Sequence, residues 1–247
     1  MRQAVERPTP MKLACASGAF HSSFVGGDLT QLEFLDLCAR ELPCDGVVLD
    51  VRHFPRGDCD YLAQIKKMAT DRGIDVAAVA DNAFFTADER RMTDVLECAV
   101  AVGAPLVAGE LARETECAWS EQLARLNVAT ALAKSANVTL ALRNAPRTFA
   151  AGVHDCKRVS KEADSAWLRF GPHALSLEAG GSPAELASNS VLLWSDAGIE
   201  SDRAIESLLQ WFPAFRGYVA LGAASESATV DAVADSLRAW RAALKNL

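Results

Sequence analysis

The sequence predicts a single α/β domain of the (β/α)8 TIM-barrel class. Three observations support this prediction: short apolar runs recur along the chain, an amphipathic stretch follows each run, and the chain has 247 residues. The runs begin about 25–35 residues apart, which is the length of one strand with its crossover helix. Eight such units fill a chain of about 250 residues, the usual size of this barrel.

The predicted strands are short and apolar along most of their length. Runs such as Val47–Leu49 and Val76–Val79 are uninterrupted, as expected for parallel strands that are buried on both faces. The eight predicted strands are Lys12–Cys15, Gly46–Val51, Asp75–Ala80, Pro105–Gly109, Val138–Leu142, Trp167–Phe170, Val191–Trp194 and Gly217–Leu221.

Capping residues mark the ends of several predicted helices. Asp28 is predicted to cap the first helix, and Thr86–Glu89 forms a predicted capping box that opens the third helix, which Gly103 ends. Ser182–Glu185 is a second predicted capping box, with a proline at the first helical position. These signals lie between the predicted strands, where the barrel requires helices.

The last predicted helix carries its apolar residues on one face. The residues of this stripe follow helical spacing, so we expect the helix to pack against the barrel. They are Val230, Val233, Leu237, Trp240 and Leu244.

The composition is that of a soluble globular domain, with 50% hydrophobic and 23% charged residues. No apolar run approaches the roughly 18–20 residues of a membrane-spanning helix. The net charge is −7 and the chain has no cluster of Lys or Arg. These features argue against nucleic acid and against an anionic membrane surface as partners.

The chain is predicted to consist of a disordered lead-in over residues 1–11 and a barrel over residues 12–247. The lead-in is polar and lacks the hydrophobic core of a signal peptide. The seven cysteines are scattered, odd in number and without C-x-x-C spacing. We therefore expect most of them to be small buried residues of a cytoplasmic protein.

A doubly wound parallel sheet is the competing fold. It would place a glycine-rich phosphate-binding turn directly after the first strand. Residues Ala16–His21 follow that strand here, and they read ASGAFH, which fits no such motif. The barrel is therefore favoured.

Polar residues at the carboxyl ends of the strands are the candidate site, because active sites of TIM barrels lie there. Carboxylates and imidazoles can transfer protons, and a guanidinium can bind a carboxylate or phosphate. The candidate catalytic residues are Asp50, His53 and Arg143. The candidate substrate-binding residues are Asn144, His173, Asp196, Glu110 and His21.

Structural roles for these residues stay open at this point. Arg143 could instead form an ion pair with Asp50, Glu110 or Asp196 that closes the mouth of the barrel. The imidazole of His53 could equally fill space as a hydrogen-bonded core group, as could that of His173.

Three segments of the sequence resemble the sugar-phosphate isomerase/epimerase superfamily, the xylose isomerase-like TIM barrels. They are Leu29–Val51, Asp75–Ala80 and Leu140–Asn144. The resemblance implies a barrel that binds a divalent cation and isomerises or epimerises sugars. The superfamily also includes AP endonucleases, but four histidines in an acidic chain are too few for their metal cluster.

The ligand set that the resemblance implies is not present in this sequence. The superfamily binds its metal through a Glu ending strand 5, an Asp ending strand 6, a His ending strand 7 and a Glu ending strand 8. Arg143, the segment Pro172–His173, Trp194 and Gly222 stand at those places. Because Arg143 keeps its positive charge and would repel a divalent cation, we predict no metal and no other cofactor.

One alternative to a metal-free barrel remains. His53 and His173 could rebuild a divalent-metal site together with Asp50 and Asp196. A metal-dependent sugar isomerase or epimerase would then be restored.

The sequence leaves three functions open. The first is the metal-dependent isomerase or epimerase that the resemblance implies. The second is a metal-free enzyme in which Arg143 stabilises a developing enolate and Asp50 or His53 acts as base. The third is a non-catalytic barrel that binds a small anionic sugar derivative or a protein partner. A homodimer is compatible with each of them.

Overall fold

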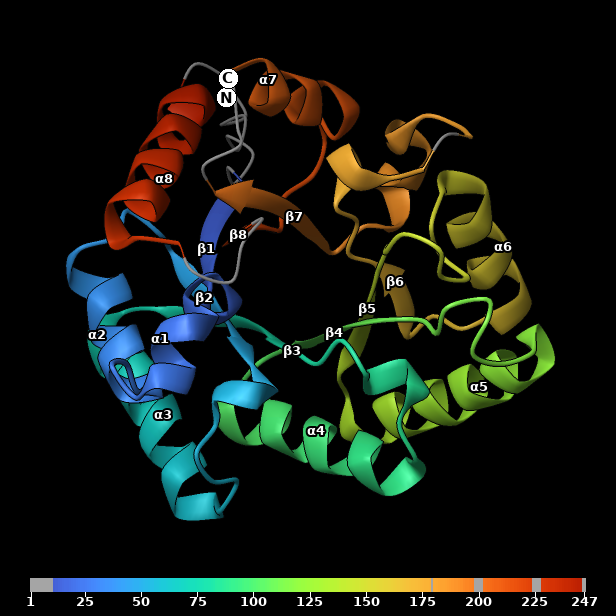
Figure 1. Cartoon of the computed structure of the whole chain (residues 1–247), viewed down its shortest axis with the longest axis horizontal. Coiled ribbons are helices and arrows are strands. Elements are labelled where there is room, and N and C mark those ends of the chain that lie inside the picture. The colour runs from blue at the N-terminus through green and yellow to red at the C-terminus, as the bar shows by residue number, and fades with distance from the viewer. Residues whose placement is uncertain (1–10, 179, 198–201, 224–227, 246–247) are drawn as a thin grey trace, which may run out of the picture.

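The structure is a computed structural model that describes residues 11–178, 180–197, 202–223 and 228–245. Eight parallel strands form a barrel with helices around the outside (Figure 1). The predicted single TIM barrel is therefore confirmed. The predicted lead-in lies outside the described residues except for Met11, which is buried in the core.

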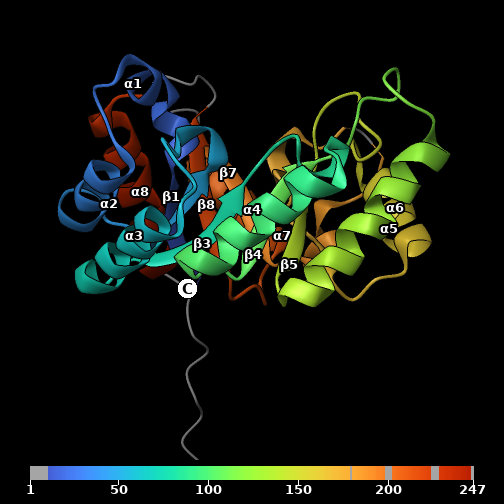
Figure 2. The same cartoon turned by 90° about the horizontal axis from the view of Figure 1, so that it is seen from below.

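Each predicted strand is present, with ends that differ by up to two or three residues from the prediction. The strands are β1 Lys12–Ala16, β2 Gly46–Asp50, β3 Asp75–Ala80, β4 Leu106–Glu110, β5 Thr139–Arg143, β6 Leu168–Phe170, β7 Leu192–Ala197 and β8 Tyr218–Ala223. The α-helices are α1 His21–Gly26, α2 Gln31–Arg40, α3 Cys59–Arg72, α4 Glu89–Val102, α5 Trp119–Ala136, α6 Val153–Ala163, α7 Asp202–Trp211 and α8 Val230–Lys245. Helices α3, α4 and α5 follow one another along one side of the molecule (Figure 2).

The strands pair in the order β6-β5-β4-β3-β2-β1-β8-β7. The first and last of these, β6 and β7, meet through isolated parallel bridges, Phe170 with Ser190 and His173 with Trp194. The barrel is thus closed more weakly between β6 and β7 than elsewhere. One of the closing bridges involves two residues near the strand ends, where the candidate site lies.

Two predicted helix starts are wrong by one turn or less. Thr30, not Asp28, caps α2: its side chain accepts the amide of Glu33, whose carboxylate accepts the amide of Thr30 in return. Asp28 lies directly after Gly27, which ends α1 in the left-handed conformation at φ 78°. That residue therefore belongs to the turn between the two helices.

Asp88, not Thr86, caps α4, through a 2.8 Å hydrogen bond from the amide of Arg91. Thr86 lies in a short 3-10 turn and donates its hydroxyl to the carbonyl of Ala83. The predicted end of the helix at Gly103 is confirmed, with φ 81°.

The predicted cap at Ser182 is confirmed, but the segment that it opens is the 3-10 helix Pro183–Asn189. The predicted stripe on α8 is also confirmed at its centre, where Val233, Leu237 and Trp240 are fully buried. Three of the seven cysteines are buried, three are half-buried and Cys59 is exposed. No helix within the described ranges is long and apolar enough to cross a membrane.

The interior of the barrel is filled mainly by small side chains. Alternate strand residues form this inner layer, most of them alanines such as Ala16, Ala80 and Ala141. The largest side chain of the layer is Trp194 of β7, which is 5% exposed. Barrel interiors are more often filled by bulky branched residues. Here small residues on several strands leave space at the barrel axis, and one indole ring from β7 fills part of it.

Candidate functional site

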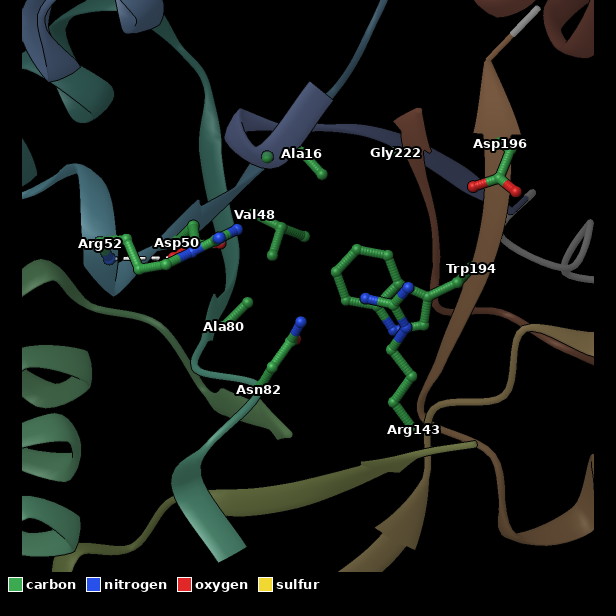
Figure 3. Close-up of a pocket in the computed structure, with 11 residues that line it drawn as sticks. Ala16, Val48, Asp50, Arg52, Ala80, Asn82, Arg143, Trp194, Asp196 and Gly222 are labelled. Carbon is green, nitrogen blue, oxygen red and sulfur yellow. Dashed lines mark hydrogen bonds and ion pairs between the residues drawn. The ribbon is translucent and has the colours of Figure 1, made fainter. Parts of the chain in front are cut away.

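A small cavity of about 130 Å³ opens at the carboxyl ends of the strands. Its wall comes from β1, β2, β3, β5, β7 and β8 or the residues that follow them (Figure 3). The lining residues are Ala16, Gly18, Val48, Asp50, Arg52, Ala80, Asn82, Arg143, Trp194, Asp196 and Gly222. Three of the predicted site residues, Asp50, Arg143 and Asp196, therefore lie in one cavity.

Arg143 is the last residue of β5 and pairs in register with Glu110, the last residue of β4. Its Nε atom lies 3.5 Å from Oε1 of Glu110 and makes no hydrogen bond within the described part of the chain. The guanidinium lies over the ring of Trp194, with Cζ 4.7 Å from the ring centroid. Arg143 is thus held by a loose ion pair and an aromatic face rather than by hydrogen bonds at Nε.

Glu110 is the partner of Arg143 among the three carboxylates that the sequence offered. Burial raises the pKa of Glu110, while the charges of Arg143 and Arg113 act in the opposite direction. The net rise shows that desolvation outweighs the two cations here. The ion pair with Arg143 therefore compensates only part of the cost of burying this carboxylate.

Asp196 lies near the end of β7 and meets His173, with Oδ2 of the carboxylate 3.1 Å from Nε2 of the imidazole. The two atoms are close but lack the alignment of a hydrogen bond, since Nε2 has no such partner among the described residues. The imidazole holds the pKa of Asp196 below its usual range; burial opposes this shift, and Arg143 adds to it. Asp196 is therefore an ionised carboxylate at neutral pH.

Asp50 ends β2 and is bound by Arg52, two residues further on. Nε and Nη2 of Arg52 lie 3.1 and 2.8 Å from the carboxylate, which also accepts the backbone amide of Arg52. This local pairing is possible because Asp50 caps the 3-10 turn Val51–His53. The pair lies across the cavity from Arg143 and Trp194 (Figure 3).

His53 and His21 form a second cluster, beside the cavity lining rather than in it. Their Nε2 and Nδ1 atoms are 2.9 Å apart, and Nδ1 of His53 lies 2.9 Å from Oγ of Ser17. Ser17 in turn accepts the backbone amide of Asp50, and His53 stacks on the ring of Phe24 at 4.1 Å. The two predicted histidines therefore contact each other and the β1–α1 segment.

Asn144 and His173 are also brought together. The backbone amide of His173 donates to Oδ1 of Asn144 at 2.8 Å, and Nδ2 of Asn144 lies 3.4 Å from the carbonyl of His173. Asn144 is 3% exposed. It therefore fixes the position of the imidazole that contacts Asp196.

Three cavity residues with large or polar side chains, Trp194, Arg52 and Asn82, are not in the candidate site that the sequence predicted. The last two follow strands and carry polar groups, so their position at the strand ends was an available signal. Trp194 stands where the resemblance implies a His ligand, but an apolar aromatic at the end of a strand is typical of core packing.

The donor set does not fit a divalent cation. Among the described residues, no three His, Cys, Asp or Glu side chains lie close enough together to bind one. In particular, Asp50 is bound by Arg52 and His53 contacts His21 and Ser17, whereas His173 meets Asp196 elsewhere. The guanidinium of Arg143 stands where the resemblance implies a Glu ligand, and a fixed cation there opposes metal binding.

Comparisons with known proteins identify the fold. No protein-family model matches the chain, and no curated protein matches it. Among solved structures it is similar to an L-ribulose 3-epimerase, with a TM-score of 0.74, 15% identity and 96% of each chain covered. The 3-keto-D-glucoside 4-epimerase YcjR from E. coli gives a TM-score of 0.72 and 14% identity, with 94% of this chain and 99% of that chain covered.

A xylose isomerase domain protein from Planctomyces limnophilus gives a TM-score of 0.72 and 12% identity, with 98% of this chain and 99% of that chain covered. Similarity of this kind, nearly full-length at low identity, identifies the fold. The chain therefore has the fold of the xylose isomerase-like TIM barrels, a group that includes sugar epimerases.

Proposed function

We propose that the protein is a sugar isomerase/epimerase-like barrel that binds a small anionic sugar derivative through Arg143 and works without a divalent cation. One observation carries this proposal. A guanidinium lies in the cavity at the end of β5, where the resemblance implies an anionic metal ligand. A fixed positive charge there favours an anion for the same reason that it disfavours a cation.

The chemistry of such a site follows from two neighbouring side chains. Arg143 would face the carbonyl oxygen of the substrate and stabilise the negative charge that develops on it. Asp196, ionised and on the same wall, would remove the proton from the adjacent carbon and return it to a different carbon or face. Isomerisation and epimerisation through an enediolate both use this proton transfer.

Asp196 is a better candidate for the base than the two residues selected from sequence. Asp50 is held by the Nε, Nη2 and backbone N–H donors of Arg52, which restrict its movement toward a ligand. His53 does not line the cavity and contacts His21 and Ser17 instead. Asp50 keeps a role in the proposal as a group that shapes the cavity wall.

A non-catalytic binding protein is the second candidate, and one feature favours it. The three carboxylates around the cavity are each engaged: Asp50 by Arg52, Glu110 by Arg143 and Asp196 by His173. A site with every carboxylate paired is electrostatically satisfied without proton transfer. Ligand binding without turnover would then be the function.

Exchange of substrate protons with solvent distinguishes the metal-free enzyme from the non-catalytic binding protein. The protein would be incubated in D2O with a panel of small sugars and sugar acids, and NMR would detect deuterium at the carbon next to the carbonyl. We expect exchange that EDTA does not abolish and that falls about 100-fold or more in Arg143→Gln, as for loss of an electrostatic catalyst. Arg158→Gln is a matched control, because Arg158 also lies over a Trp ring, at 4.8 Å from Trp119, outside the cavity.

Two results of the same experiment would contradict the proposed function. Exchange that appears only after Mn²⁺ or Co²⁺ is added would overturn the metal-independent proposal. Ligand-induced stabilisation without exchange would favour the binding protein.

A further inference from the structure

We infer that the ligand of this cavity is a short-chain carboxylate of about two to four carbons that carries a hydroxyl or oxo group next to the carboxylate. This inference rests on the proposed binding of an anion by Arg143 and narrows it to one chemical class. It is argued from the volume of the cavity, from the groups that limit this volume, and from the donors and acceptors on its walls.

The volume of the cavity limits the part of the ligand that can be enclosed. Pockets for larger ligands usually measure about 300–1,000 Å³, whereas an apolar cavity of about 150 Å³ holds benzene, a molecule of six non-hydrogen atoms. The cavity here measures about 130 Å³. A three-carbon hydroxy acid has about this number of non-hydrogen atoms, and a hexose has about twice as many.

Trp194 and Arg143 are the side chains that keep the cavity small. The indole ring projects from β7 toward the barrel axis and the guanidinium lies against it (Figure 3). Elsewhere the wall includes the short side chains of Ala16 and Ala80 and the backbone of Gly222. The size limit therefore depends on these two side chains rather than on the backbone.

Arg143 selects the charge of the ligand. Its contact with Glu110 is long at 3.5 Å and lacks hydrogen-bond alignment. A carboxylate can approach a guanidinium with two parallel hydrogen bonds, which is the stronger arrangement. A ligand carboxylate would therefore gain contacts that Glu110 does not make.

A second polar group on the ligand fits the remaining walls. Asp196 can accept a hydrogen bond from a ligand hydroxyl, and the side-chain amide of Asn82 can donate to an oxo or hydroxyl oxygen. Both residues line the same small cavity as Arg143. In a cavity of this size, such a group has to lie close to the carboxylate.

Inorganic phosphate shares part of this chemistry, since it is small and can bind a guanidinium bidentately. Sugar phosphates exceed the volume limit by the same argument as hexoses. Phosphate is therefore a separate arm of the test rather than a second proposal.

Isothermal titration calorimetry with a matched set of probes tests the inference. The probes are glycerate, its neutral counterpart glycerol, the six-carbon acid gluconate, fructose and inorganic phosphate. We expect glycerate to bind about tenfold or more tightly than each of the others, the ratio that one good charge-assisted contact supplies. Arg143→Gln should remove this preference, and Arg158→Gln should keep it.

A variant of Trp194 tests the size limit separately. In Trp194→Leu, gluconate should gain about tenfold in affinity relative to glycerate, because the cavity extends where the indole ring was. Circular dichroism and a melting curve establish that the variant is folded, and Trp194→Phe serves as a milder replacement if it is not.

The outcomes separate this inference from the proposed function. Equal binding of glycerol and glycerate, or tighter binding of phosphate, would overturn the carboxylate assignment. Tight binding of gluconate or fructose by the unaltered protein would overturn the size limit. If that binding depended on Arg143 and not on metal, the proposed function would stand. If no probe bound in a way that depends on Arg143, this inference would be overturned. The proposed function would then be tested by the deuterium-exchange experiment with other sugars in the absence of metal.

Discussion

The guanidinium of Arg143 lies over the indole ring of Trp194, with its Cζ atom 4.7 Å from the ring centroid. The two residues come from β5 and β7, which are separated by the short strand β6. The stack therefore spans the region where the barrel is closed by isolated bridges rather than by a full ladder. It contributes both to the closure of the barrel and to the charge of the cavity.

Replacing Arg143 by Glu should create affinity for a divalent cation. The new carboxylate would stand at the strand-5 position, near Glu110 and Asp196, and the repelling charge would be removed. Titration with Mn²⁺ by calorimetry should show binding in Arg143→Glu and none in Arg143→Gln, which removes the charge without adding a ligand. If the two variants behave alike, Arg143 does not occupy the ligand position that the resemblance implies.

The free energy of unfolding of Glu110→Gln at pH 7 should equal that of the unaltered protein or exceed it by up to about 1 kcal/mol. We expect this although the variant loses an ion pair. The pKa of Glu110 is raised because its burial disfavours the charged form. An acid with a raised pKa in the folded state destabilises folding above that pKa, and this penalty is absent below the pKa of the unfolded chain. Denaturant unfolding should show stability falling as the pH rises through this window, and less so in Glu110→Gln. A variant that is several kcal/mol less stable at pH 7 would show that the ion pair outweighs desolvation.

Asp196→Asn should give the opposite dependence on pH. The pKa of Asp196 is lowered, chiefly by His173, so the ionised carboxylate stabilises the folded state. This stability is fully present above the usual pKa of an aspartate, about 3.9, and is lost as the pH falls through the lowered pKa. The variant should therefore be less stable than the unaltered protein at pH 7 and nearly equal to it in acid, as measured by denaturant unfolding. A difference that does not change with pH would mean that the amide substitution acts through packing alone.

His53→Ala should cost about 2 kcal/mol of unfolding free energy. The buried imidazole joins Ser17 to His21 and stacks on Phe24, so its removal leaves polar atoms without these partners and opens a gap. Because His53 does not line the cavity, affinity for anions should change by less than threefold, or about 0.6 kcal/mol. A loss of ligand affinity without a loss of stability would instead assign His53 to the site.

The number and order of the strands could be predicted from sequence because buried parallel strands leave uninterrupted apolar runs. The helix caps were less certain, since Thr86 and Asp88 both begin patterns typical of an N-cap and only tertiary packing selects between them. Thr86 is drawn into a 3-10 turn that follows β3. Local patterns therefore gave the element but not its first residue.

The partner of Arg143 could not be predicted, because three carboxylates follow neighbouring strands. The choice of Glu110 depends on the register of β4 against β5, and Asp50 is excluded by its own neighbour Arg52. Neither relationship is visible as a motif. The role of Trp194 was missed for a related reason, since its effect on the cavity depends on small residues of other strands.

Asn144 is a positioning residue whose replacement should alter the ionisation of Asp196. Its Oδ1 accepts the backbone amide of His173, and His173 lowers the pKa of Asp196. In Asn144→Ala that buried amide loses its acceptor, which should cost about 2 kcal/mol of unfolding free energy. The imidazole should also become less well placed, so the pKa of Asp196, followed by NMR, should rise toward its usual range.

Asn144→Asp is the matched variant, because it keeps an oxygen that can accept the amide of His173 and loses the Nδ2 group that lies 3.4 Å from the carbonyl of His173. It should retain a lowered pKa at Asp196 more fully than Asn144→Ala does. If both variants leave that pKa unchanged while stability falls, Asn144 supports the loop after β6 without positioning His173. If both raise it equally, the amide donor of Asn144, rather than its oxygen, holds His173 against Asp196.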